Sequence, residues 1–555
     1  MKALLVGLFL FSSLFSSIGH TAILSEKEGE ALRNLPVQAD GRIKPFDSFA
    51  REMLELVYGK QKYEKRDAYE IILTWMLAPQ TWQAKELFEV RNFEVLNRLG
   101  LDNQKRYYKG EELFSGAKFS ELRAELAAKR ETKEKLTPYF QALQRLENQY
   151  FVFSEIATGR MIRVLPPKEG DAWISVADMP QGPAQEKFLE LTKSFITLIG
   201  GMAEGRSDSE ISTAKQDLDT KVAAFQELAR AESPEKYANQ TKIDVESFYN
   251  RVHPFKWAYI FYLLGAVAVL FSWITSKHGV MMPAWGLVTI GFLVHTAGFG
   301  LRSFLMDRAP VTNMYETVVW VAWGSIVFAA VLEKIYKFKF ILMAGALIAS
   351  FGMIIADTAP VVLDPSLQPL EPVLRSNYWL TIHVMTITVS YAAFFLAFAL
   401  GDIGLIYFLK GEQQHKDKIK AIVMSIYRAI QIGVVFLAPG IILGGIWADY
   451  SWGRFWGWDP KETWALIALL GYLAVIHGRL VGWVRDFGMV ACGVLTFSLV
   501  IMAWYGVNFV LGAGLHSYGF GAGGVEYVSG FVIAHLLLVV YTTVIRNARL
   551  KTVKV

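Results

Sequence analysis

One short stretch of the chain combines aromatic residues and glycines at a spacing that could bind a flat ligand. It reads WGRFWGWDPKE and runs from Trp452 to Glu462. Glycines let the backbone come close to a flat partner, and aromatic rings supply large apolar contact areas. Membrane interfaces also favour tryptophan, which would explain one or two of these rings but not four aromatics together. The stretch therefore predicts a surface for a large, planar, apolar ligand. The residues predicted to bind it are Trp452, Gly453, Phe455, Trp456, Trp458 and Asp459.

Two histidines could supply metal ligands beside this surface. His383 follows the start of a long apolar segment, and His516 lies in a polar loop between two later segments. Imidazole is the commonest protein ligand of haem iron, and two histidines can fill its axial positions. A single histidine near a helix end is usually a hydrogen-bonded polar residue, but two beside one aromatic surface are harder to dismiss. We therefore predict a haem-binding surface with His383 and His516 as iron ligands.

Four further ionisable residues lie in or at the ends of apolar segments, where such side chains are costly and tend to be functional. His477 precedes Gly-Arg at one end of its segment. A histidine in this position could bind a molecule during its passage across the membrane. For His295 and His535 the sequence leaves open a functional role or a packed, hydrogen-bonded one. A proton relay at Asp402 is not favoured, because no acid or histidine lies at helical spacing from it.

The elements that must position these residues are long apolar segments separated by short polar loops. The chain has 555 residues, of which 53% are hydrophobic and 19% charged. Because a helix needs about 20 apolar residues to cross the hydrocarbon, each segment can be tested by its length. The predicted fold class is an all-α, polytopic membrane helical bundle of about nine spans with a mainly helical N-terminal extracytoplasmic domain. The predicted spans are 257–276, 283–303, 315–333, 340–358, 379–409, 430–448, 464–482, 487–509 and 528–546.

Basic residues indicate which side of the membrane each loop faces, since loops rich in lysine and arginine stay in the cytoplasm. The basic loops are 333–339, 410–428 and 479–485, together with the C-terminal tail. The loops that alternate with them are then external, and they include the tryptophan-rich stretch. An odd number of spans also places the N-terminal domain outside. We predict the bacterial inner (cytoplasmic) membrane, with this domain and the tryptophan-rich loop on the periplasmic side.

The chain divides into three predicted parts. Residues 1–22 are typical of a signal segment, with Lys2, an apolar run and then small residues. An uncleaved anchor is the alternative, and both place the next part outside the cytoplasm. Residues 23–250 form the extracytoplasmic helical domain, in which we find no catalytic constellation and expect a docking or scaffold role. Residues 251–555 form the transmembrane haem-handling domain.

Charge and cysteine content exclude several functions. The net charge of +5 is small and spread along the chain, so we expect no nucleic-acid partner. Cys492 is the single cysteine, which excludes a disulfide framework or a Cys-x-x-Cys redox pair within the chain. Thiol chemistry would therefore need a partner's thiols. The glycine-rich run from Gly519 to Gly524 follows no strand, so it does not predict a dinucleotide site.

At this point the residues match a known family. The segment Trp452–Leu466 (WGRFWGWDPKETWAL), followed by His477, resembles the tryptophan-rich (WWD) signature of the haem-handling cytochrome c biogenesis proteins. Within this superfamily the chain looks most like the CcsA (ResC) branch of the System II synthetase. Three further stretches agree with that resemblance: Arg302 with Pro310–Glu316, Val507–Gly519, and Leu35–Pro45.

The resemblance implies roles for particular residues. His383 and His516 correspond to the external histidines that ligate haem iron at the tryptophan-rich loop, and His477 to a transmembrane histidine that holds haem during its passage. Many relatives carry Gly-His before the proline of the Pro-x-x-Asn-x-Tyr-Glu motif, whereas this chain has Arg308 and Ala309 there. No iron ligand is therefore assigned at that position.

The resemblance also implies an activity and partners. The activity is that of a holocytochrome-c synthase (haem lyase), which joins the vinyl groups of haem b to the cysteines of a Cys-x-x-Cys-His segment in apocytochrome c. No catalytic side chain is assigned, and Arg454 and Lys461 could pair with haem propionates or anchor the loop. The expected partners are a ResB/CcsB-like membrane subunit, whose span pattern is not found before Trp257, and a periplasmic thiol reductant.

Two other classes of function were weighed. One is a haem transporter without synthetase activity, which would move haem outward near His477. It differs from a synthetase in forming no holocytochrome c when apocytochrome is supplied. The other is a quinone-linked haem oxidoreductase subunit, which would need histidine pairs on facing helices that the sequence does not place.

Overall fold

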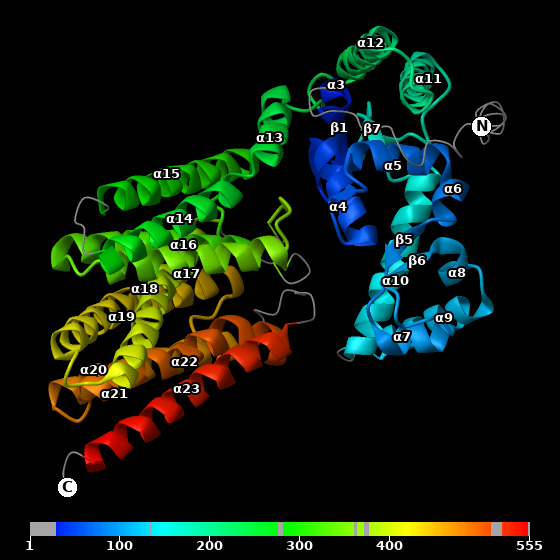
Figure 1. Ribbon diagram of the computed structural model, residues 1–555. Helices are drawn as coiled ribbons and strands as arrows, with labels where there is room; N and C mark the ends of the chain where they lie inside the picture. The colour runs from blue at the N-terminus through cyan, green and yellow to red at the C-terminus, as the bar shows by residue number, and fades with distance from the viewer. Residues whose placement is uncertain are drawn as a thin grey trace. The chain divides into compact units, whose positions relative to one another are not determined.

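Helices make up most of the chain in the computed structural model (Figure 1), which confirms the predicted all-α class. The structure describes residues 29–132, 136–275, 281–359, 363–370, 377–511 and 524–552. The predicted signal segment and His516 lie outside these residues. Two compact units meet in the sequence between Val252 and His253, and each is described by itself.

The N-terminal unit is a helical domain with short hairpins. Its strands pair in sequence order as antiparallel, two-stranded sheets within the described residues. These strands are β1 (Pro36–Ala39), β2 (Arg42–Pro45), β3 (Lys62–Tyr63), β4 (Arg66–Asp67), β5 (Glu86–Glu89), β6 (Tyr107–Lys109), β7 (Arg163–Leu165) and β8 (Ile174–Ser175). Its helices are α3 (Glu30–Arg33), α4 (Phe46–Tyr58), α5 (Ala68–Leu77), α6 (Pro79–Gln83), α7 (Phe93–Leu99), α8 (Gly110–Phe114), α9 (Ala117–Glu131), α10 (Pro138–Ala157), α11 (Pro183–Ala203), α12 (Asp208–Glu232) and α13 (Gln240–Val252).

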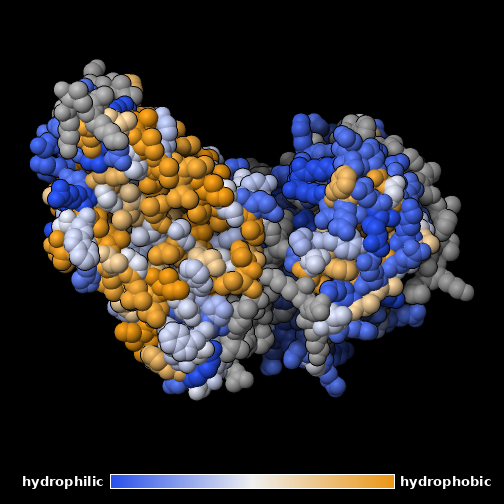
Figure 2. All heavy atoms as spheres, turned by 90° about the horizontal axis from the view of Figure 1, so that it is seen from below, coloured by the Kyte–Doolittle hydropathy of each residue, from blue (hydrophilic) through white to orange (hydrophobic). Residues whose placement is uncertain are grey.

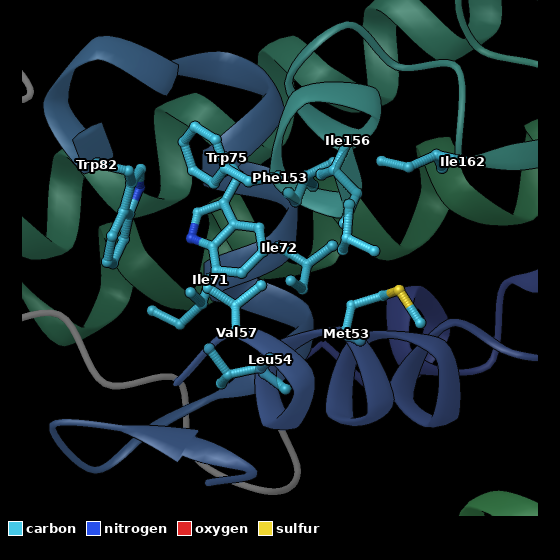
Figure 3. Close-up of a cluster of buried hydrophobic side chains, with 14 of the residues drawn as sticks. Met53, Leu54, Val57, Ile71, Ile72, Trp75, Trp82, Phe153, Ile156 and Ile162 are labelled. Carbon is cyan, nitrogen blue, oxygen red and sulfur yellow. The ribbon is translucent and has the colours of Figure 1, made fainter. Parts of the chain in front are cut away.

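The core of this unit forms where α4, α5 and α10 pack together. Apolar residues recur on α4 at helical spacing, so one face of the helix can be buried against its neighbours. Trp75 on α5 and Phe153 on α10 lie with their ring centroids 5.3 Å apart at the centre of this cluster (Figure 3). Full burial of such a side chain contributes about 1.5–3 kcal/mol. The domain therefore has a hydrophobic core of its own.

The second unit is a bundle of long apolar helices. In the described part of the chain, 9 helical segments are long and apolar enough to cross a membrane, which confirms the predicted number of spans and a multi-pass membrane protein. Hydrophobic side chains cover much of its visible face in Figure 2. Its helices are α14 (Pro254–Thr275), α15 (Met281–Met306), α16 (Met314–Tyr336), α17 (Phe340–Thr358), α18 (Asn377–Lys410), α19 (Lys416–Trp452), α20 (Pro460–Leu480), α21 (Asp486–Leu495), α22 (Phe497–Ile501), the π-helix η2 (Met502–Leu511) and α23 (Val525–Thr552).

The helices α18 and α19 pack closely along most of their lengths because glycines on α19 let them approach. A Cβ atom on Gly433 would lie 2.2 Å from the ring of Phe394, and one on Gly440 would lie 3.0 Å from the backbone of Ile387. The ring of Phe394 also stacks on Tyr472 of α20, with 3.6 Å between centroids. Together, α18, α19 and α20 form the frame that holds the tryptophan-rich loop.

Two predicted loop boundaries were wrong. The basic stretch 410–428 is helical from Lys416 onward, because Ile419, Ile422 and Ile426 recur at helical spacing and are buried. The external loop predicted between the spans 430–448 and 464–482 is also shorter than expected, since α19 continues to Trp452 and α20 begins at Pro460. The segment that departs from helix there runs only from residue 453 to residue 459.

Candidate functional site

The tryptophan-rich loop lies between the C-terminus of α19 and the N-terminus of α20, and capping residues define both helix ends. The helix α19 ends at Gly453, whose φ of 71° is readily adopted by glycine. Asp459 then caps α20, and Pro460 takes the first helical position, where a missing N–H costs nothing. Glu462 completes a capping box with Asp459. The WDPKE part of the motif is therefore a helix start.

Glu462 also holds the interior of the loop. Its Oε2 accepts hydrogen bonds from the backbone N–H groups of Gly457 at 2.8 Å and Asp459 at 3.1 Å, while its Oε1 pairs with Arg454 at 3.2 Å. A Cβ atom at position 457 would lie 1.5 Å from the Arg454 guanidinium, so any other residue there would push that side chain out of its present position. One carboxylate thus fixes the path of the whole turn.

The loop presents some of its aromatic rings outward and packs others inward. Phe455 is 49% exposed and Trp458 70% exposed, although both are large apolar side chains. Trp456 lies edge-on to Trp458, with 5.8 Å between ring centroids. By contrast, Trp452 packs edge-on against Trp447 of α19 at 4.6 Å. Asp459 is buried at its cap position, where its Oδ1 accepts a hydrogen bond from the backbone N–H of Lys461 in the first turn of α20.

His383 on α18 lies beside this loop. Its ring is parallel to Trp447, with 6.2 Å between centroids and 8° between planes. A Cβ on Gly444 would meet the His383 ring at 2.6 Å, and one on the next residue, Gly445, would meet the ring of Phe455 at the same distance. Gly444 and Gly445 of α19 therefore leave room for the rings of His383 and Phe455, which lie next to each other against this helix.

The tautomer of His383 follows from its hydrogen bond. Its Nδ1 lies 2.9 Å from the carbonyl oxygen of Gly440. A carbonyl oxygen only accepts, so Nδ1 carries the proton and the basic lone pair is on Nε2. Metal-binding histidines commonly have this arrangement, because the bond to the carbonyl orients the ring and raises its basicity. The residue type, tautomer and surroundings fit an iron ligand.

The other predicted ligands are placed differently. His516 lies outside the described residues. His477 is near the far end of α20, about 24 Å along the helix from Lys461 at 1.5 Å per residue. It is exposed, and its Nδ1 lies 2.7 Å from the Leu473 carbonyl oxygen. His383 and His477 therefore lie at opposite ends of the bundle and do not form one site. His295, by contrast, is fully buried and bonded to Tyr262.

A link between three sequence motifs was not predicted. Lys461 of the tryptophan-rich motif lies with Nζ 3.1 Å from Oδ1 of Asn508, and the Asn508 amide nitrogen lies 3.5 Å from the sulfur of Met314. Asn508 sits in the π-helix η2, a wide turn that often occurs at functional sites. Contacts across helices therefore join the stretches around 314, 461 and 508.

The departure at Arg308 also has a structural explanation. Arg308 and Arg302 each bind one oxygen of Glu316, at 3.0 and 2.9 Å, and all of these side chains are buried. Each arginine also donates to a carbonyl oxygen of the segment 363–370, Arg302 to Pro365 and Arg308 to Gln368. Leu370 of that segment packs against the cluster of Leu380 and Trp447, against which Trp452 also packs. The arginines thus support the aromatic loop indirectly, through the segment 363–370. The sequence signal for this group was the presence of charged residues at the ends of apolar segments, where such residues are costly unless they are paired.

Asp402 has a partner on another helix that spacing along its own segment could not show. Its Oδ2 lies 3.3 Å from Nε2 of His535, which is on α23 rather than at helical spacing on α18. The signal available in the sequence was that each of these residues is ionisable within an apolar segment and needs a partner. No group of three or more metal-binding side chains occurs in the described part of the chain.

These features define a class: a polytopic helical membrane protein with an exposed aromatic loop beside a histidine on a neighbouring span. Comparison with known proteins gives the family. The profile described as "Cytochrome C assembly protein" matches residues 311–516. CcsA of Parasynechococcus marenigrum is 33% identical over 292 residues, covering 47% of this chain and 93% of the relative. CcsA of Guillardia theta is 29% identical over 307 residues, with 50% and 98% coverage. The chain belongs to the cytochrome c assembly proteins of CcsA type.

A longer relative extends the match. NrfI of Wolinella succinogenes is 28% identical over 531 residues, which covers 89% of this chain and 55% of NrfI. This chain therefore spans about half the length of that relative. The aligned share is larger than the membrane unit alone can supply, so the N-terminal domain also has a counterpart in NrfI.

Proposed function

We propose that this chain binds haem b on the tryptophan-rich loop and presents it for covalent attachment to apocytochrome c. The observation that carries the proposal is the position of His383. Its Nδ1–H donates to Gly440, its basic Nε2 is suited to iron, and its ring stands beside Trp447 and the loop. Membership of the cytochrome c assembly family supplies the reaction class. The exposed rings of Phe455 and Trp458 are suited to hold the flat face of the porphyrin.

The reaction adds each cysteine S–H of a Cys-x-x-Cys-His segment across one haem vinyl group. The sulfur bonds to one vinyl carbon and the hydrogen ends on the other, so no external oxidant is consumed. Holding a thiol beside a vinyl carbon removes much of the entropic barrier, up to about 7–11 kcal/mol in well-oriented reactions. The chain's part is to fix the porphyrin, which is the substrate, while His383 and His516 hold the iron.

Partners follow from the same chemistry. The cysteines of apocytochrome c must be reduced to react, so a periplasmic thiol reductant is required, and the chain's own Cys492 lies within a span. We further propose a ResB/CcsB-like membrane subunit that completes the route of haem, and a location in the bacterial inner membrane with the loop on the periplasmic side. The basic loops described above support this orientation.

Haem export without attachment is the second candidate function. The exposed imidazole of His477 supports it, because its Nδ1 faces the Leu473 carbonyl and leaves Nε2 basic at the opposite end of the bundle from His383. Export and attachment would be successive steps in one protein, or export could be the whole function. The two differ in whether apocytochrome c gains haem.

The test is to purify the chain with its ResB-like partner and to measure haem by visible spectrum and pyridine haemochrome. We expect bound haem in the wild type, loss of it in the His383→Ala/His516→Ala double variant, and no change in the control His415→Ala. Addition of apocytochrome c then separates synthetase from transporter by formation of holocytochrome c. A complex without haem, or a double variant with full haem and normal cytochrome maturation, would refute the ligand assignment.

A further inference from the structure

We propose that Asp402 and His535 form a proton-binding site within the membrane, and that the bound proton fastens α23 to α18. Both residues lie in the interior of candidate spans. Oδ2 of Asp402 and Nε2 of His535 are 3.3 Å apart. The site stands independently of the proposed haem chemistry, since it uses none of the residues assigned to it.

The need for a proton follows from the hydrogen bonds of His535. Its Nδ1 lies 2.7 Å from the carbonyl oxygen of Phe531, which can only accept, so Nδ1 carries a hydrogen. A neutral imidazole would then turn the lone pair of Nε2 toward the Asp402 carboxylate. Two lone pairs at this distance repel each other. One further proton between the two atoms converts the repulsion into a hydrogen bond.

The low polarity of the surroundings favours the protonated pair. With the shared proton, the pair is neutral overall, either as carboxylic acid and imidazole or as carboxylate and imidazolium. Without it, the pair has a net negative charge inside the membrane, which is costly. The rings of Phe531 and Phe398 lie 4.3 and 4.8 Å from the His535 ring. Oδ1 of Asp402 is buried and has no hydrogen-bond partner among the described residues, so little else stabilises an ionised carboxylate.

The Asp402–His535 pair, here called the clamp, matters because α23 makes few other contacts with the rest of the bundle. Only 11% of the most apolar 18-residue stretch of α23 is buried, which is the lowest share among the candidate spans. Val539 and Thr542 are the buried side chains of this helix in the part that the structure describes. Near its C-terminal end Arg546 pairs with Glu412 at 2.9 Å. Asp402 and His535 are therefore the polar link between α18 and α23 in the middle of the membrane.

Other titratable groups on the packed helices lie away from this pair. On α21, Val490 and Val494 face Gly401 of α18, so Cys492 points about 200° around the helix from Val490. The other titratable side chains of the three helices are Tyr378, His383, Tyr391, Tyr407 and Lys410 on α18, Asp486 on α21, and Glu526, Tyr527, Tyr541, Arg546, Arg549 and Lys551 on α23. His535 is the one charged partner that acts on Asp402 in the described residues.

The first experiment reads the proton directly, in the full chain in lipid nanodiscs at neutral pH. Infrared spectroscopy reports the Asp402 carboxyl group and nitrogen NMR the His535 ring, each assigned by difference from Asp402→Asn and His535→Gln. We expect either a protonated carboxyl group or a doubly protonated imidazole. An ionised carboxylate beside a neutral imidazole would overturn the proposal.

The second experiment tests the clamp by hydrogen exchange of α23 peptides. Asp402→Asn replaces the shared proton by an amide N–H donor, so α23 should stay as protected as in the wild type. Asp402→Leu removes the bond without a buried charge, so exchange in the middle of α23 should rise several-fold. The control Glu412→Gln should affect the C-terminal end of α23 alone. Equal protection in Asp402→Leu and wild type would show that the pair does not hold the helix.

Discussion

Nδ1 of His383 lies 2.9 Å from the carbonyl oxygen of Gly440, so a helix backbone determines which nitrogen of this imidazole carries the proton. The same helix, α19, carries Gly444, Gly445 and Trp447 against His383 and the loop. Ring orientation and the path of the aromatic loop therefore depend on one helix. Changes to α19 should alter haem binding even when every proposed ligand is kept.

The first prediction concerns Gly444→Ala. Alanine is a better helix former than glycine by about 1 kcal/mol, so α19 itself should not be weakened. The new methyl group would lie 2.6 Å from the His383 ring and push it away from its position. We expect haem retention to fall toward that of His383→Ala, with a changed visible spectrum. Gly530→Ala on α23 is the matched control, because a Cβ there meets nothing within 4 Å. Normal haem content in Gly444→Ala would contradict the proposed ligand geometry.

The second prediction concerns Glu462→Gln. The glutamine can still accept from the backbone N–H groups and so keep the capping box, but it loses the ion pair with Arg454 and the negative charge that strengthens those hydrogen bonds. Hydrogen bonds to a charged acceptor contribute about 1.5–3 kcal/mol and those to a neutral one about 0.5–1.5 kcal/mol, so the turn should be held less firmly. We expect weaker haem binding and faster hydrogen exchange in residues 453–462, with the other helices unchanged. Exchange as slow as in the wild type would show that Glu462 does not hold the turn.

The third prediction concerns Arg308→Ala. Leaving a buried charge without a partner costs about 3–5 kcal/mol. Arg302 still pairs with Glu316 in this variant, so the cost should be smaller, but the midpoint of thermal unfolding should still fall measurably. The segment 363–370 should also lose a contact at Gln368. Arg479→Ala is the control, because its pair with Asp486 is partly exposed and such pairs contribute about 0–1 kcal/mol. Similar midpoints for both variants would argue against a supporting role for Arg308.

The fourth prediction concerns pH and the N-terminal domain. Burial raises the pKa of Glu52 to about 7 from its ordinary value of 4.5, although Lys44 and Arg42 act in the opposite direction. A raised carboxyl pKa favours the folded state when the group is protonated, so this contribution is complete below pH 4.5 and is lost as pH rises through about 7. We expect α4 peptides to be better protected from hydrogen exchange at acidic than at alkaline pH, after correction for intrinsic rates.

Glu52→Gln should remove this pH dependence, because glutamine does not titrate. Glu86→Gln is the control, since Glu86 is half exposed in its contact with Lys105. A pH dependence that persists in Glu52→Gln would assign it to another group.

Local features of the site could be read from the sequence. Segment length and hydropathy were sufficient for the number of spans, because the cost of unpaired backbone in lipid enforces continuous helices. The aromatic loop was located by composition alone, but Asp459, Pro460 and Glu462, which begin α20, were assigned to the loop. The ends of α19 were misjudged, because basic and aromatic residues continue a helix as readily as they end it.

Contacts between helices could not be read in the same way. His383 with Gly440, Asp402 with His535, and Arg302 with Glu316 each join residues on different helices. Such pairs depend on how each helix is rotated and shifted against its neighbours. Hydropathy along one helix does not specify this, because nearly every face of a membrane helix is apolar. The sequence alone thus determined the spans, the helical N-terminal domain and the aromatic loop, whereas the packing of the helices decided which polar groups meet and which imidazole nitrogen remains basic.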